Sequence, residues 1–186
     1  MDTKRIIRES LTAANAKRDK GSSERIKHRN RSKMFVESLA MKLREYYAGE
    51  GIFVLSRHSP DHRREFGLNE LLYDILVCKT DQVRSRSENG NLTYVTGAIW
   101  QVESEFARNR RQAIYDFNKL VLGSSQNKLF IGPIVSDEDV FLQTVGGPAK
   151  YCDSNTYIAL VRHPSKWKLV PLDVHCWKFD NGWKPI

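Results

Sequence analysis

Two apolar segments of this 186-residue sequence carry carboxylates at positions where a β-strand would bury them. Asp74 lies inside residues 71–77, and Glu103 and Glu105 lie inside residues 99–106. An uncompensated buried charge is too unfavourable to persist, so each carboxylate must be paired, protonated or bound to a metal ion. Three converging carboxylates form a hard oxygen site of the kind that Mg²⁺ uses beside a phosphate group. The pattern therefore points to metal-dependent phosphodiester chemistry.

The alternation of side chains along a strand decides which carboxylates can meet. Glu103 and Glu105 share one face, with their positions about 7 Å apart along the strand. Asp74 shares its face with Leu72 and Leu76, which is a poor match to a solvent-facing surface. Each carboxylate taken alone is also explained by a buried ion pair or by an exposed strand face opposite Lys or Arg. Taken together, the three favour a shared site.

The remaining pattern predicts one α/β domain. A chain of this length can bury a substantial core. Helical and strand periods alternate along it. The expected elements are a helix at 34–47, strands at 52–55, 71–78 and 92–106, a helix at 108–122, a strand at 129–131, a short helix at 137–144, and strands at 157–161, 167–172 and 174–179, with polar loops at 57–64 and 80–91. This order predicts a mixed central sheet flanked by helices.

The positive charge is concentrated near the N-terminus. The formal net charge is +8, and residues 1–33 alone hold 11 Lys or Arg against 4 Asp or Glu. We therefore expect residues 1–32 to form a basic arm, partly mobile or helical, attached to a single domain at residues 33–186. Such an arm suits a polyanionic partner, although a solvated tail explains it equally well. Its Ile6 and Leu11 would also allow packing on the body or on a second copy.

Other features of the sequence exclude several classes of protein. No run of about 18 apolar residues is present, so we expect no membrane span. The first residues lack the apolar stretch of a secretory signal. Cys78, Cys152 and Cys176 are an odd set without metal-binding spacing, which is typical of reduced thiols. A cytoplasmic protein without a membrane partner is the expectation.

The order of elements across residues 34–135 resembles the PD-(D/E)xK nuclease superfamily. Asp74 on one strand and Glu103-Ser104-Glu105 on the next carry this resemblance. It implies a restriction-endonuclease-like core. It also implies that Mg²⁺, or Mn²⁺ in its place, is held by Asp74, Glu103 and a glutamate on the preceding helix, which by position is Glu37.

The motif departs from the common pattern at two positions. Tyr73 stands where proline is common, and Glu105 replaces the lysine that is thought to orient water or stabilise developing charge. A carboxylate there can ligate metal or accept a proton from the attacking water. The Glu-x-Glu variant is similar to that of restriction enzymes of the BamHI type. Arg108 or Lys119 could supply the displaced positive charge.

The resemblance thus implies a nuclease, an endonuclease rather than an exonuclease, that acts on DNA rather than RNA. Its catalytic residues would be Asp74, Glu103 and Glu105, and the same three with Glu37 would bind the metal. Residues expected to contact nucleic acid are Arg57, Arg63, Arg64, Arg108 and Lys119. Nucleic acid is the expected partner, with a homodimer also compatible. The alternatives are a catalytically inactive nucleic-acid-binding or regulatory protein on the same fold, and an assembly protein that docks an acidic partner.

Overall fold

The computed structural model of the protein describes residues 1–16, 23–56, 71–87, 90–107, 109–167 and 172–186. Four α-helices and seven β-strands lie within these ranges. The helices are α1 (Thr3–Ala16), α2 (Glu24–Tyr46), α4 (Arg110–Leu122) and α5 (Glu138–Ala149), with a short 3-10 helix η2 at Pro164–Lys166. The strands are β1 (Ile52–Ser56), β2 (Ile75–Ser85), β3 (Gly90–Ser104), β4 (Asn127–Pro133), β5 (Asn155–Val161), β6 (Val174–Phe179) and β7 (Trp183–Pro185).

The seven strands form one mixed sheet in sequence order. β1, β2 and β3 are antiparallel, β3, β4 and β5 are parallel, and β5, β6 and β7 are antiparallel again. Parallel neighbours need a crossover, and α4 and α5 provide the two crossovers here. The predicted α/β class with a mixed sheet is therefore confirmed.

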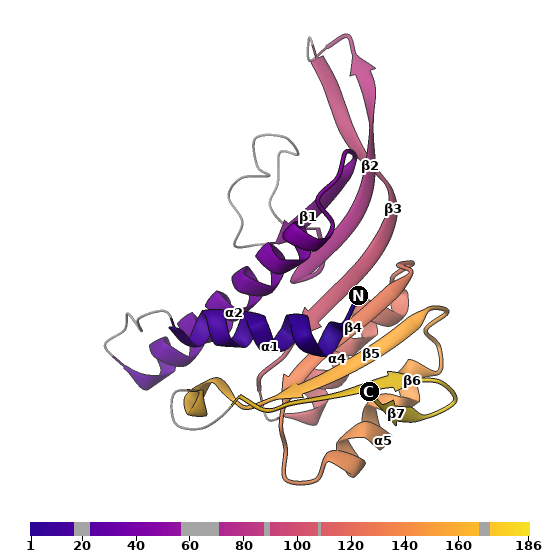
Figure 1. The fold of residues 1–186 in the computed structure, drawn as a ribbon. Helices are drawn as coiled ribbons and strands as arrows, with labels where there is room; N and C mark the ends of the chain where they lie inside the picture. The colour runs from indigo at the N-terminus through magenta and orange to yellow at the C-terminus, as the bar shows by residue number, and fades with distance from the viewer. Residues whose placement is uncertain (17–22, 57–70, 88–89, 108, 168–171) are drawn as a thin grey trace.

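The helices cover the two faces of the sheet and give a three-layer arrangement (Figure 1). On one face, Phe35 and Leu39 of α2 pack in a core with Val102 of β3. On the other face, Phe117 of α4 contacts Phe130 of β4, with ring centroids 5.6 Å apart. Because strand side chains alternate, Leu129 and Ile131 of β4 enter the first core and Phe130 between them enters the second.

The N-terminal residues are part of this body. α1 buries Ile7, Leu11 and Ala14 against α2 and β6, and the Lys4 ammonium donates to the Ile186 carbonyl oxygen at 2.9 Å. Apolar residues spaced three or four apart give α1 this buried stripe. α2 begins after its N-cap Ser23 and continues to Tyr46. The domain boundary expected after residue 32 therefore falls inside a continuous helix.

The outer half of the β2–β3 pair projects beyond the helices (Figure 1). β2 continues to Ser85, which pairs with Gly90 of β3. The polar loop predicted at 80–91 is therefore wrong for 80–85 and 90–91, which are strands. Most side chains here are exposed, so strand formation needs only the backbone ladder and no apolar alternation. This polar hairpin gave no strand signal in the sequence.

The cysteines and the helices bear on two further expectations. Cys78, Cys152 and Cys176 are all free thiols, as expected, and the first and last are buried. None of the helices in the described ranges combines the length and apolar character needed to cross a membrane.

Candidate active site

The predicted carboxylates meet where β2 begins and β3 ends. These two ends lie together because β2 and β3 are antiparallel, with Ile75 opposite Val102. The prediction that Asp74 lies inside a strand is wrong, since β2 starts one residue later. Leu72 has a φ of 65°, in the left-handed region, and this turn prevents the strand from starting earlier.

Asp74 is nevertheless fixed against the end of β3. The backbone N–H of Ser104 donates to Asp74 Oδ2 at 2.9 Å, and the Ser104 hydroxyl donates to the same oxygen at 2.5 Å. The preceding residue, Tyr73, is buried and donates its hydroxyl to the Lys119 carbonyl at 3.3 Å. The turn before β2 is thus tied to both β3 and α4.

Glu103 is the most deeply buried member of the group, with 2% of its surface exposed. Its Oε2 accepts a hydrogen bond from the Lys119 ammonium at 3.1 Å. The same ammonium lies 2.9 Å from Asp116 Oδ1, one turn earlier on α4. Glu103 Oε1 is also buried, and it has no hydrogen-bond partner among the residues that the structure describes. This oxygen is therefore available to accept a hydrogen bond or to bind a cation.

Burial alters the protonation of this cluster. It raises the pKa of Glu103 to about 8, with Asp74 acting in the same direction and Lys119 opposing it. Burial also raises the pKa of Glu105; the Ala107 N–H opposes this change, and Asp116 and Asp74 add to it. For Lys119, burial lowers the pKa, but hydrogen bonds and charge attraction from Asp116 and Glu103 outweigh it, so the pKa rises. The negative potential that these shifts report favours a cation.

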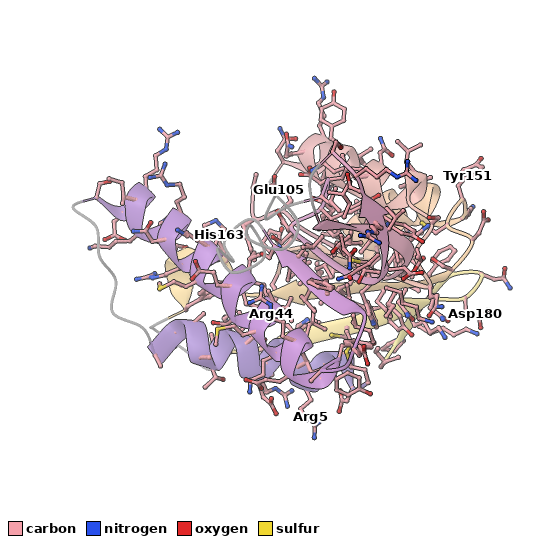
Figure 2. All side chains as sticks on the ribbon, turned by 90° about the horizontal axis from the view of Figure 1, so that it is seen from above. Arg5, Arg44, Glu105, Tyr151, His163 and Asp180 are labelled. Carbon is pink, nitrogen blue, oxygen red and sulfur yellow. The ribbon has the colours of Figure 1, made fainter. Side chains whose placement is uncertain are left out.

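Glu105, labelled in Figure 2, lies just beyond β3. Its backbone N–H donates to the Ile131 carbonyl at 2.9 Å, and its carboxylate accepts from the Ala107 N–H. Together with Asp74 and Ser104 it borders a cavity of about 590 Å³ against α2. The half-buried Glu105 therefore faces space that a substrate can enter.

The donors present fit Mg²⁺, although they do not form a complete cage. Within the described ranges, no three Asp, Glu, His or Cys side chains are grouped closely enough to hold a metal ion by themselves. Mg²⁺ sites commonly use one or two carboxylates and complete the shell with water and substrate phosphate. Asp74 and Glu103, with its unpartnered Oε1, supply oxygens of that kind.

The other predicted site residues are placed as follows. Lys119 contacts Glu103 directly. Glu37 lies on α2 with its Oε1 3.9 Å from the Lys33 ammonium, and no described hydrogen bond or ion pair links it to the carboxylate group. Arg57, Arg63, Arg64 and Arg108 lie outside the described residues.

The sequence reasoning missed Asp116, which is 9% exposed on α4. A signal for it was present, because Ala113, Asp116, Phe117 and Leu120 follow helical spacing and share one face. A carboxylate on the apolar face of a helix needs a partner, as it does in a buried strand. Lys119 is that partner.

No match was found between this chain and any family model, curated protein or solved structure.

Proposed function

We propose that the protein is a Mg²⁺-dependent nuclease that hydrolyses phosphodiester bonds, in DNA rather than RNA. The observation that carries this proposal is the buried carboxylate of Glu103. One of its oxygens is held by Lys119, and the other has no partner among the described residues. Asp74 is bound by Ser104, the residue that follows Glu103, and it raises the pKa of Glu103, so the two carboxylates lie at the same end of β3.

Lys119 supports the proposal in a second way. The superfamily that the sequence resembles has a lysine at the position of Glu105, and here Lys119 reaches Glu103 from α4, where it also pairs with Asp116. The observed order of α2, three antiparallel strands, α4 and the parallel β4 is also the order on which the resemblance rests. These features favour a restriction-endonuclease-like core.

The side chains present would divide the reaction among them. Asp74 and Glu103 would hold Mg²⁺, which supplies Lewis-acid chemistry by polarising water and offsetting phosphate charge. Ser104 holds Asp74 in position through two hydrogen bonds. Glu105, whose pKa is raised by burial, suits a general base that takes a proton from the attacking water. Lys119 orients Glu103 and places positive charge beside it.

A second function is favoured by the same lysine. Lys119 already compensates Glu103 and Asp116, so the cluster is also consistent with a structural ion pair in a protein that binds nucleic acid without cutting it. Binding and cleavage must therefore be measured separately.

The test uses the full chain with labelled DNA and RNA, single-stranded and duplex, in Mg²⁺, Mn²⁺ or EDTA. We expect metal-dependent cleavage that is lost in Glu103→Gln and kept in Glu45→Gln, whose carboxylate is exposed on α2 and paired with Lys42. Binding without cleavage would favour the second function. Neither binding nor cleavage would contradict both.

A further inference from the structure

Two cavities lie one after the other along the chain at the end of β3 and just beyond it. The α2 cavity, described above, is bordered by residues 104–106 and by α2. A second cavity of about 410 Å³, the α4 cavity, is bordered by Ala107, by Asn109 at the start of α4, and by residues 133–137 after β4. The cavities therefore follow one another along the edge of the sheet, with Glu105 in the first and near the start of the second.

Each cavity is bordered by two cations, and the α4 cavity is also bordered by Asp137, whose carboxylate accepts from the Val140 N–H. Arg29 and Lys33 border the α2 cavity, and Arg110 and Lys166 border the α4 cavity. Within the described part of the chain, Arg29, Arg110 and Lys166 form no ion pair. The Lys33 ammonium is 3.9 Å from Glu37, with both side chains partly exposed. Such a surface pair is weak and leaves the ammonium available to a stronger anion.

The packing of α2 against η2 holds both groups of cations at one end of the sheet. The Arg31 guanidinium donates to the Pro164 carbonyl at 2.6 Å, and the rings of His28 and His163 contact edge to face, with centroids 5.8 Å apart. η2 ends at Lys166. Arg29 and Lys33 are four residues apart and so share one face of α2.

The α2 cavity thus brings two cations to the carboxylates of Asp74 and Glu105, and the α4 cavity adds two cations beyond Ala107. A phosphate group would be repelled by the carboxylates alone, so a nucleic-acid strand needs positive charge on both sides of them. Contacts of this type fix the position of the backbone and do not read its sequence.

We propose that one strand of nucleic acid lies along this edge, with phosphates held by Arg29 and Lys33 in the α2 cavity and by Arg110 and Lys166 in the α4 cavity. The inference rests on the proposed function, and it adds the path of the substrate. The phosphate between the two groups would lie at Asp74, Glu103 and Glu105.

The test measures binding in EDTA, so that cleavage does not contribute. The affinity of the full chain for a labelled single-stranded oligonucleotide is measured by fluorescence anisotropy over a range of salt concentration. The variant Arg29→Gln/Arg110→Gln removes one cation from each cavity. The variant Arg8→Gln/Lys150→Gln removes the same charge from exposed positions that border neither cavity.

Each phosphate contact contributes about 0.7 to 0.9 to the slope of log affinity against log salt. We expect the first variant to reduce this slope by roughly 1.4 to 1.8 and the second by less than about 0.7. Both variants should melt at the wild-type temperature because all four side chains are exposed.

The outcomes separate this inference from the proposed function. Absence of binding by the wild-type protein would contradict both. Binding by the wild type with equal slopes for the two double variants would contradict the path alone. A loss that depends on base sequence would also overturn it, because phosphate contacts are common to all sequences.

Discussion

The two halves of the β2–β3 pair have the same backbone pairing and opposite environments. The base of the hairpin, residues 75–78 with 99–104, is buried between the helical layers, whereas the tip, residues 80–85 with 90–95, projects into solvent (Figure 1). Register shifts on either side of residues 78 and 79 separate the halves. Such irregularities bend a strand and allow it to leave the body.

An aspartate lies beside each half, and the two aspartates have different environments. Asp74, beside the base, accepts two hydrogen bonds from Ser104 and raises the pKa of Glu103. Asp81, in the tip, is exposed and accepts a hydrogen bond from the Tyr94 hydroxyl at 3.3 Å. Strand pairing alone therefore leaves a carboxylate exposed to solvent, whereas neighbouring elements enclose the carboxylates at the base.

The largest expected effect comes from removing the carboxylate at the base. Asp74→Ala should lower Mg²⁺-dependent cleavage by about 10³-fold, since a metal-held charge is worth several kcal/mol in the transition state. Asp81→Ala, its match in the tip, should cleave at the wild-type rate. Single-turnover cleavage at saturating metal measures both. Equal rates for the two variants would show that the base is not the site.

The next largest effect is expected at Glu105, where the superfamily that the sequence resembles has a lysine. Glu105→Lys should lower cleavage by about tenfold or more, because Lys119 already supplies the cation and the substitution removes the proposed general base. The same assay measures it, with folding checked by circular dichroism. A large gain in rate would instead show that Glu105 marks a decayed catalytic site.

A smaller effect is expected in the pH dependence of stability. The folded-state pKa of Glu103 is about 8, above its ordinary value of 4.5. Between these two pH values the unfolded chain releases a proton that the folded protein retains, so the wild type loses stability as pH rises. Glu103→Gln removes this loss, and its advantage over the wild type should grow by about 1 to 2 kcal/mol from pH 5 to about pH 6.5.

Urea unfolding in EDTA at both pH values measures this change, and Asp81→Asn is the control from the tip. Parallel pH profiles for Glu103→Gln and the wild type would contradict a buried, protonated Glu103.

The smallest effect should come from shortening the tip. Replacing residues 83–92 by an Asn-Gly turn should change the free energy of unfolding by less than about 1 kcal/mol, because the removed side chains bury little surface. Cleavage should stay within about twofold of wild type. A marked loss of DNA affinity, measured by anisotropy, would mean that the tip contacts the substrate.

The sequence predicted best those elements that bury an apolar face. β1, β4, β5 and β6 each include the strand expected at their position, and α4 matches the helix expected at 108–122 within two residues. The strand expected at 167–172 is not confirmed: Trp167 follows η2, and 168–171 lie outside the described residues. Residues 80–85 and 90–91 of the tip were missed because strand pairing in solvent leaves no periodic apolar signal, whereas residues 92–95 lie in the strand expected at 92–106.

The sequence predicted which residues form the site better than it predicted the contacts between them. The spacing along each segment identified Asp74, Glu103 and Glu105 as unusual. The ion pair between Lys119 and Glu103 joins a helix to a strand. A single sequence does not show which residues of a helix and a strand lie opposite one another. Asp116 was different, because its partner Lys119 lies one turn later on the same helix, and only the contact of Lys119 with Glu103 required the placement of α4 on the sheet.

The packing of α1 against β6 affects the order in which the chain can fold during synthesis. The hydrogen bond from the Lys4 ammonium to the Ile186 carbonyl joins residues that are 182 apart in sequence. Cys176 of β6 also belongs to the same core as Leu11 of α1. Synthesis releases α1 before β6, so this core can close only after β6 has emerged. The opposite core, which includes α4, β4 and α5, joins near neighbours and can form earlier. We therefore expect one side of the sheet to be completed before the other, which leaves the apolar stripe of α1 exposed in the interval.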